Sequence, residues 1–231
     1  MQRIPIYVGY DDREQSGYTV FCSSVLRRTK EPVSFHPMKG QKVEGSTQFN
    51  PERFKIPEEQ EYRGWAIWAE SDMLCLGDIA ELMAFADPKY DVLVAPHSYK
   101  TKFPVKFLGQ ANPDYPGKNR TSLMLINCNG AVWQRLMYAD PPLTLSQLHR
   151  LPKTIPSEGR AVPGFRVGDL PLEWNWLVQE YKYNPKAKLA HFTIGIPPFY
   201  PNCDYSSDWF QELREAASNE HWDSTELVSE R

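Results

Sequence analysis

Short hydrophobic runs alternate with amphipathic stretches along most of this chain. The runs are rich in β-branched and aromatic residues and are apolar at consecutive positions, which is typical of strands buried on both faces. The amphipathic stretches repeat apolar residues every three or four positions, the spacing of one helix face. Together they predict an α/β fold, with a mostly parallel sheet and helices on both faces. The predicted strands are residues 4–10, 64–69, 90–96, 121–128 and 187–194, and the predicted helices are 17–28, 78–86 and 173–181.

Two segments lack this periodicity. Residues 140–170 are rich in proline and glycine, and we predict a mobile loop over a site there. The polar residues 218–231 predict a flexible tail after a single domain of residues 1–217. In the helix at 17–28, the residues available for a buried face are Val20, Phe21, Val25 and Leu26.

The composition is that of an ordinary globular protein, with 41% hydrophobic and 24% charged residues in 231. The net charge of -3 does not indicate nucleic acid as a partner, although it leaves a local basic patch open. The four cysteines are widely scattered, which favours free thiols in a reducing compartment. No apolar stretch reaches the roughly 18 residues of a membrane span. The amino terminus enters a strand-like run directly, so we expect no signal peptide and a cytoplasmic protein.

Polar residues follow several of the predicted strands. Ligands of open α/β sheets bind beyond the carboxyl ends of the strands, so these residues are candidates for a site. They are Tyr10, Asp11 and Asp12 after the first strand, Glu70 and Asp72 after the second, Asn127 at the end of 121–128, and His191 in the late strand.

Glu70 and Asp72 have two interpretations. Acids at a strand end can simply cap the next helix, but Asp78 and Glu81 already have capping-box spacing. Two positions apart in an extended segment, the side chains of Glu70 and Asp72 point to one face and can hold a hard divalent ion. His191 is either a structural residue or a further ligand. The other histidines form no HExxH cluster, so a zinc hydrolase is not expected: His36, His97, His149 and His221.

Four blocks of the sequence, in order, resemble family 8 glycosyltransferases. "ESDMLCLGDIAEL" is similar to their D-x-D and G-D-I block, and "TSLMLINC" to their V-M-L-I-N strand. "LPLEWNWL" resembles their L-P-x-x-W-N segment, and "HFTIGIPPF" their carboxy-terminal H-x-x-G-x-x-K-P-W motif. The likeness covers about residues 4 to 210, and a bacterial and phage branch is the most similar.

The resemblance implies a GT-A type, Rossmann-like domain that transfers a sugar with retention from a nucleotide-diphosphate donor, with a UDP-sugar expected. It implies a divalent metal, Mn²⁺ or Mg²⁺, with Asp72 as principal ligand, Glu70 as the first acid of the motif and His191 as the carboxy-terminal ligand. The acceptor stays open: a surface glycan is the default, and a protein or modified nucleic acid is an alternative. By position, Gly9, Tyr10 and Asp11 lie where the family holds the nucleobase, and Asn127, Trp174, Asn175 and Gly195 belong to its donor-binding blocks.

The sequence departs from the family pattern in two places. Glu70 stands where an aspartate is usual, and Ile196, Pro197 and Pro198 follow Gly195 where a lysine normally neutralises the diphosphate. Lys106 and Lys118 are the candidates to replace that lysine, or they are solvated loop residues. For a double displacement, Glu173 is the candidate nucleophile, with an exposed helical glutamate as the alternative.

Two other functions remain open. A nucleotidyltransferase that makes nucleotide sugars has a similar fold and metal use, although the segment after the first strand, "VGYDDREQSG", is acidic and lacks a basic, glycine-rich triphosphate site. The departures at Glu70 and at the missing lysine are also compatible with a catalytically weak protein that binds a nucleotide sugar.

Overall fold

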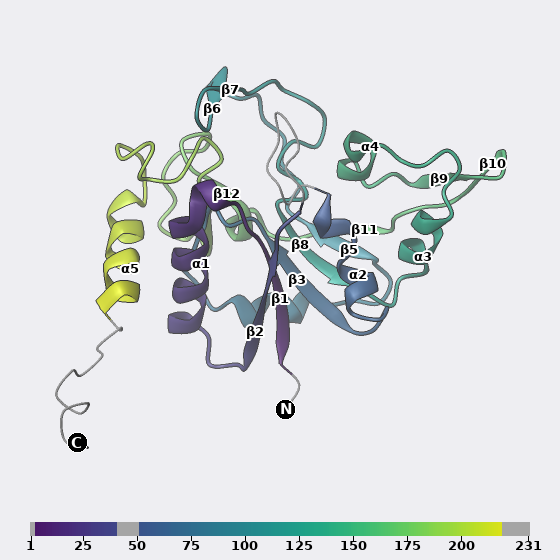
Figure 1. The fold of residues 1–231 in the computed structure, drawn as a ribbon, viewed down its shortest axis with the longest axis horizontal. Coiled ribbons are helices and arrows are strands. Elements are labelled where there is room, and N and C mark those ends of the chain that lie inside the picture. Colours follow the sequence, from purple (N-terminus) through teal and green to yellow (C-terminus); the bar gives the residue numbers. More distant parts are fainter. Residues whose placement is uncertain (1–2, 41–50, 219–231) are drawn as a thin grey trace, which may run out of the picture.

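A six-stranded mixed sheet forms the centre of the protein (Figure 1). This computed structural model describes residues 3–40 and 51–218 of the chain. The strand order is β11-β5-β8-β3-β1-β2. The strands are β1 (Ile4–Gly9), β2 (Val33–Met38), β3 (Trp65–Ala69), β5 (Val92–Val94), β8 (Leu123–Asn127) and β11 (Val167–Asp169). The strands predicted at 4–10, 64–69, 90–96 and 121–128 are confirmed, whereas β2 and β11 were not predicted.

Both directions of strand pairing occur in this sheet. β1 lies parallel to β2 and to β3, and β11 lies parallel to β5. β8 runs antiparallel to both of its neighbours, β3 and β5. The prediction of a mostly parallel, mixed sheet is confirmed. Because β8 is reversed, its start, not its end, lies beside the carboxyl end of β3.

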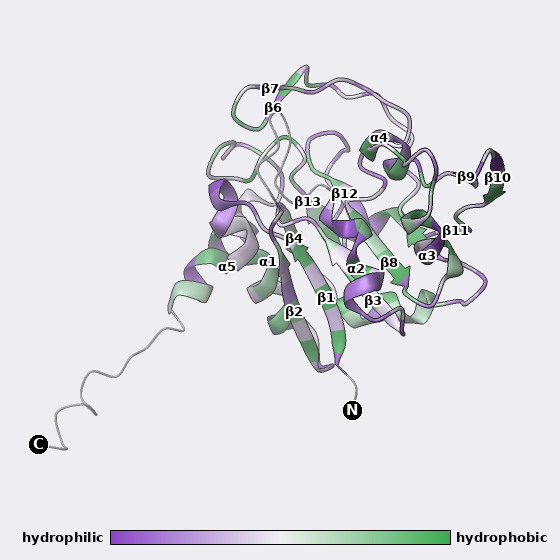
Figure 2. Ribbon diagram, turned by 45° about the vertical axis from the view of Figure 1, so that its right-hand side comes forward, coloured by the Kyte–Doolittle hydropathy of each residue, from purple (hydrophilic) through white to green (hydrophobic). Residues whose placement is uncertain are grey.

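Hydrophobic layers cover both faces of the sheet. α1 (Gln15–Arg28) packs on one face, and α2 (Ile56–Glu59) and α3 (Ala131–Met137) pack on the other. Successive strand residues alternate between the two layers, as the pleat requires: Ile67 lies in the first and Trp68 in the second. Figure 2 shows hydrophobic residues gathered on central strands, β8 among them. This packing explains why the strands read as continuous apolar runs.

The last helix, α5 (Ser206–Ser218), lies beside α1 (Figure 1). Glu212 of α5 is buried and joins the two helices: it accepts a hydrogen bond from Ser23 Oγ (2.8 Å) and pairs with Arg28 Nη1 (2.9 Å). The helix predicted at 17–28 is confirmed, but the prediction that Leu26 is buried is wrong. Leu26 follows Val25 by about 100° around the helix, which turns it to solvent, and it is 59% exposed.

A smaller sheet of three strands has the order β12-β13-β4. The strand predicted at 187–194 is confirmed as β13, but the helix predicted at 173–181 is wrong. A 3₁₀ helix, Leu172–Asn175, leads directly into β12, because this segment has a partner strand in β13: Val178 N–H donates to the His191 carbonyl (2.9 Å). The strands are β4 (Met73–Cys75), β12 (Trp176–Leu177) and β13 (Leu189–His191).

The region 140–170 contains short regular elements that the sequence pattern did not reveal. Its prolines interrupt the repeat of apolar positions that would indicate a helix or strand, so the sequence predicted only a loop. Thr144 and Gln147 form a capping box at the start of α4. The elements are α4 (Leu145–His149), the hairpin of β9 (Thr154–Ser157) and β10 (Arg160–Pro163), and β11.

The helix predicted at 78–86 is a 3₁₀ helix, Ile79–Phe85. Asp78 is its N-cap, as predicted, and accepts a hydrogen bond from Ala80 N (2.9 Å). Glu81 pairs with Lys188 instead of completing a capping box. The remaining elements are the 3₁₀ helices Asp12–Glu14 and Glu52–Phe54 and the hairpin of β6 (Val105–Lys106) and β7 (Gln110–Ala111).

Other predictions concern features away from the sheets. The polar tail predicted at 218–231 lies, beyond Ser218, outside the described residues. Among the residues that the structure describes, no helix is long and apolar enough to cross a membrane. All four cysteines are free thiols: Cys75 and Cys128 are buried, and Cys22 and Cys203 are half-buried.

Candidate metal and donor site

A cavity of about 510 Å³ opens beyond the carboxyl end of β3. Its wall includes Glu70 and Asp72, the β6–β7 hairpin, part of the segment 110–122, and α4. Lys106 and Gly195, both predicted to bind the donor, also line it. The volume is within the range of about 300–1,000 Å³ typical of sites for small molecules.

Two strand pairings bring the predicted ligands together. Glu70 N–H donates to the Ser122 carbonyl (3.0 Å), which extends the β3–β8 ladder to the cavity. Asp72 directly precedes β4, where Met73 lies opposite His191 of the antiparallel β13. Phe192 N–H then donates to the Asp72 carbonyl (2.9 Å). The backbone therefore holds His191 against the acids, although the sequence separates them widely.

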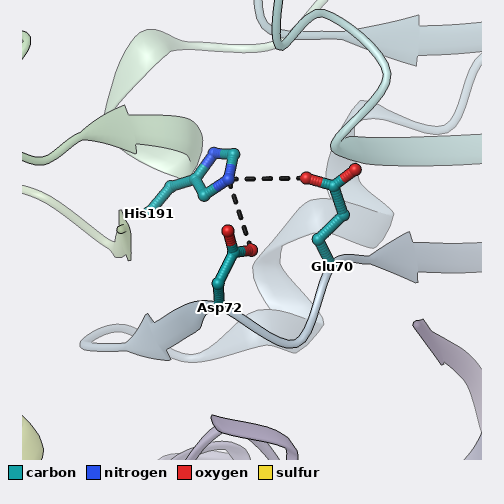
Figure 3. Close-up of side chains that lie close together, drawn as sticks. All are labelled: Glu70, Asp72 and His191. Carbon is teal, nitrogen blue, oxygen red and sulfur yellow. Dashed lines mark ion pairs between the residues drawn. The ribbon is translucent and has the colours of Figure 1, made fainter. Parts of the chain in front are cut away.

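Glu70, Asp72 and His191 form one cluster, with ligand atoms within 4.8 Å of one another (Figure 3). His191 Nε2 lies 3.3 Å from Asp72 Oδ1 and 3.5 Å from Glu70 Oε2. Apart from this ion pair with His191, the buried Asp72 Oδ1 has no hydrogen-bond partner among the described residues. Two carboxylates and an imidazole that converge on one point, with Asp72 Oδ1 free of other hydrogen bonds among the described residues, form a set of ligands that fits a divalent cation.

Asn175 orients the imidazole of His191. Its Oδ1 lies 2.8 Å from His191 Nδ1, and its Nδ2 donates to Ser122 Oγ (3.0 Å) and the Asn119 carbonyl (3.2 Å). Since Asn175 Oδ1 can only accept, Nδ1 carries a proton and Nε2 is the nitrogen directed at the acids. Asn175 is therefore a positioning residue for the cluster, and it does not line the cavity formed by the described residues.

The charges of the cluster are strongly coupled. Burial alone would lower the pKa of His191, but the charge and hydrogen bond of Asp72 and those of Glu70 raise it to about 9. Burial would raise the pKa of Glu70, but the charges and hydrogen bonds of Arg53 and His191 lower it overall. Without a metal, the protonated imidazole of His191 and the guanidinium of Arg53 together balance the two carboxylates.

Arg53 supports Glu70 from the wall of the cavity. Its Nη2 lies 2.6 Å from Glu70 Oε1, and its Nη1 donates to the Thr121 carbonyl (2.6 Å). The guanidinium also stacks 4.8 Å from the ring centre of Trp68. The longer Glu70, in place of the usual aspartate, thus spans from Arg53 to His191. No spacing signal pointed to Arg53, because this pair joins separate elements.

The residues predicted at the nucleobase lie at the end of β1, beside the site. They are Gly9, Tyr10 and Asp11, and the cavity wall formed by the described residues does not include them. Asp11 is buried and accepts from Arg13 N (3.0 Å) and Arg13 Nε (2.8 Å). Tyr10 packs edge-on against Tyr18, with ring centres 5.3 Å apart.

Asn127 does not lie where the sequence predicted. Because β8 is antiparallel, Asn127 pairs with Trp65 at the start of β3, the opposite end from Glu70. Its Nδ2 donates to the Tyr90 carbonyl (3.0 Å). The strand-end prediction is wrong for Asn127, since that rule assumes strands that run in the same direction.

Three other predicted site residues do not line the cavity that the described residues form. Trp174 is buried in the core on the α1 face of the sheet, not at the cavity. Lys118 is buried, and its ammonium donates to Asn112 Oδ1 (2.7 Å), the Asn112 carbonyl (3.3 Å) and the Pro113 carbonyl (3.1 Å), while burial lowers its pKa. These oxygens already satisfy its donors, so Lys118 does not replace the missing lysine. Glu173, the candidate nucleophile, lies in a 3₁₀ helix and outside the cavity wall as described.

Glu14 and His149 line the cavity, but the sequence did not single them out. Glu14 follows Asp11 by three positions, and its burial, with the charges of Asp72 and Asp11, raises its pKa well above the usual range. His149 Nδ1 lies 2.6 Å from Thr121 Oγ1, and burial lowers the pKa of His149 to about 4. Glu14 could have been found from the sequence, because it belongs to the polar run after the first strand. No sequence pattern indicated that His149 lies at the cavity.

No family model matches the chain. Protein CDI of Arabidopsis thaliana is 31% identical over an alignment 235 residues long, gaps included, which covers 91% of this chain and 86% of that protein. Solved glycosyltransferases share the fold. WbbM, a bifunctional glycosyltransferase, matches with a TM-score of 0.61 at 13% identity, over 94% of this chain. GlyE of Streptococcus pneumoniae TIGR4 matches with a TM-score of 0.59 at 13% identity, over 95% of this chain.

An active-site mutant of LgtC matches with a TM-score of 0.59 at 10% identity, over 92% of this chain. The chain spans 51% of the length of WbbM and 64% of GlyE, but 96% of LgtC. These likenesses confirm the predicted GT-A fold. Membership of family 8 and of its bacterial and phage branch stays a prediction.

Proposed function

The chain belongs to the same family as Protein CDI of Arabidopsis thaliana, and from this premise and its GT-A fold we propose that it is a metal-dependent glycosyltransferase. It would move a sugar, with retention, from a nucleotide-diphosphate donor to an acceptor. The observation that carries the proposal is the convergence of Glu70, Asp72 and His191 at one cavity. Acids there that only capped the next helix would have no reason to meet a histidine from a strand more than a hundred residues later in the chain.

Asp72 and His191 would hold the metal, with Glu70 as a third ligand. Two observations support this assignment: the buried Asp72 Oδ1 has no hydrogen-bond partner among the described residues beyond its ion pair with His191, and Asn175 orients the imidazole. Mn²⁺ or Mg²⁺ would stabilise the negative charge that develops on the departing diphosphate. Glu70, held by Arg53, keeps its carboxylate ionised and aimed at His191.

Lys106 is the base that we propose for the diphosphate. It lines the cavity, and the described residues offer it no ion pair. Its hairpin is attached to the segment that lacks the usual lysine, since Phe107 N–H donates to the Ile194 carbonyl (2.7 Å). Phe107 also contacts Phe199 edge-on, with ring centres 5.8 Å apart. Lys106 therefore approaches the Gly195 turn from the hairpin instead of from the strand.

A UDP-sugar is the proposed donor, and a surface glycan is the default acceptor by analogy alone. For a double displacement, Glu173 is no longer the candidate nucleophile, because it lies outside the cavity wall. Retention therefore requires attack from the leaving-group side or a carboxylate that lines the cavity.

A thermal-shift panel tests the proposal. The uridine, guanosine, adenosine and cytidine diphosphates are each added with and without Mn²⁺, and we expect uridine diphosphate with Mn²⁺ to raise the unfolding temperature most. Release of free sugar from the corresponding nucleotide sugar then measures activity. If no nucleoside diphosphate shifts the unfolding temperature with any divalent ion, the proposal is wrong.

The same panel separates the alternatives. Binding of the nucleotide without release or transfer of sugar would identify a catalytically weak binding protein. Release of pyrophosphate from a nucleoside triphosphate in the presence of a sugar phosphate would identify a nucleotidyltransferase.

A further inference from the structure

Glu14 is a buried acid whose position has no evident structural purpose. It is the last residue of the 3₁₀ helix Asp12–Glu14 and occupies the N-cap position of α1, but its side chain makes no capping hydrogen bond. Only 4% of its surface is exposed, and it lines the same cavity as Asp72. A glutamate at a helix start would normally face water or cap the helix.

The first turn of α1 holds Glu14 next to the metal cluster. Gly17 packs so closely on the turn between Glu70 and Asp72 that a Cβ there would lie 2.9 Å from the Ser71 carbonyl oxygen. A larger residue would push α1 away from this turn. The close packing therefore fixes the distance between Glu14 and the cluster.

The neighbouring acids all have basic partners, whereas Glu14 has none in the part of the chain that the structure describes. Asp11 pairs with Arg13 (2.6 Å), Asp12 with Lys39 (2.8 Å) and Glu70 with Arg53 (2.6 Å). The Glu14 carboxyl group makes no hydrogen bond or ion pair with residues 3–40 and 51–218. It is only affected at longer range by the charges of the neighbouring acids and of Arg13. A buried carboxyl group without a partner is unfavourable, so a bound molecule is the natural source of one.

We infer that Glu14 hydrogen-bonds to a hydroxyl or N–H group of the bound donor, next to the phosphates, and so helps to select it. The inference rests on the proposed function, which assigns the phosphates to the metal cluster and Lys106. The ionised Glu14 carboxylate repels phosphate, and an N–H or O–H group that donates to it favours this ionised form, so its partner is in the organic part of the donor. Ribose hydroxyls, base N–H groups and hydroxyls of the transferred sugar all offer the required hydrogen-bond donor.

Three probes with increasing numbers of such groups test the inference by calorimetry in the presence of Mn²⁺. They are pyrophosphate, uridine diphosphate and uridine diphosphate glucose. Glu14→Ala should leave pyrophosphate affinity unchanged and weaken the nucleotides by about ten- to a hundredfold, as expected for a hydrogen bond to a charged group. Weakening of both nucleotides assigns the contact to the nucleoside, and weakening of only the nucleotide sugar assigns it to the sugar.

Two control variants accompany this test. Asp12→Asn removes an exposed acid from the same turn, outside the cavity wall, and should bind all three probes like the wild type. Glu14→Gln keeps the shape and one acceptor, so it should recover part of the affinity and unfold at the same or a higher temperature than the wild type. A lower unfolding temperature in Glu14→Gln would show a structural role and overturn the inference.

Other outcomes are also decisive. Equal affinities of wild type and Glu14→Ala for all three probes would overturn the inference, and so would an equal loss for pyrophosphate and the nucleotides, which would make Glu14 a metal ligand. A wild-type protein that binds none of the probes would instead overturn the proposed UDP-sugar site, and the inference with it.

Discussion

Asp72 and Asp91 are two acids next to strands of the same fold, at opposite ends of the central sheet, with opposite surroundings. Both carboxylate oxygens of Asp91 are satisfied by Arg166, through its backbone N (2.8 Å), Nε (3.1 Å) and Nη2 (2.8 Å). Asp72 has one buried oxygen without a hydrogen bond among the described residues. Its nearest charged partner is His191, 3.3 Å away.

This difference separates an acid that stabilises the fold from one that is kept for a ligand. Asp91 ties β5 to the segment before β11, and its backbone carbonyl also accepts from Asn127 N (3.0 Å). Asp91 is not part of the cavity wall that the described residues form. Asp72 lines a cavity, and among the described residues its buried Oδ1 has only the ion pair with His191. Buried polar atoms with so few partners are uncommon where no function requires them.

The largest effect is expected for Asp72→Asn. The amide keeps the shape but supplies no charge for a hard cation, so Mn²⁺ affinity should fall by more than roughly a hundredfold, beyond the usual loss for a supporting residue. The metal-free protein should stay folded but unfold at a somewhat lower temperature, because the amide no longer balances the charge of the protonated His191, whose Nε2 lies 3.3 Å from Asp72 Oδ1. Titration of Mn²⁺ followed by electron paramagnetic resonance measures the affinity. Wild-type Mn²⁺ affinity in this variant would contradict the assignment.

The next effect concerns the support of His191. Asn175→Ala removes the acceptor for His191 Nδ1, so Mn²⁺ affinity should fall by about ten- to a hundredfold. Asn129→Ala is the matched control, because Asn129 lies with Asn127 at the opposite end of the sheet. It should bind Mn²⁺ like the wild type. Equal affinities in both variants would show that the imidazole is held without Asn175.

Asp91→Asn should have the reverse pattern from Asp72→Asn. It weakens a charged contact to a backbone N–H and a guanidinium, and we expect the free energy of unfolding to fall by about 2 kcal/mol. The loss is modest because the Arg166 side chain is 56% exposed, so solvent screens its charge. Urea denaturation measures the loss, and Mn²⁺ affinity should stay unchanged. A fall in Mn²⁺ affinity would mean that the two ends of the sheet are coupled.

Glu70→Asp should have the smallest effect. It restores the more usual acid of the motif but is one methylene too short to keep the 2.6 Å contact with Arg53 while facing His191. The loss should be about 1 kcal/mol of stability, with Mn²⁺ affinity reduced only a fewfold. Denaturation and metal titration of the same sample measure both quantities. A loss as large as that of Asp72→Asn would make Glu70 the principal ligand.

Much of the fold and part of the site could be read from the sequence, because local spacing determines which way side chains point. Consecutive apolar positions identified β1, β3, β5 and β8, since strands covered on both faces need them. The two-residue spacing of Glu70 and Asp72 placed both acids at one strand end. The same reasoning failed for residues 173–181, where pairing with β13 overrides a helical pattern.

Strand direction and the partners of each acid were decided only by the tertiary structure. The reversal of β8 took Asn127 away from the site and brought Ser122 to it, and the pairing of β4 with β13 delivered His191. Arg53 and Glu14 reached the cavity through packing between separate elements. Burial of the whole core selects these long-range pairings, and no local pattern of a single segment encodes them.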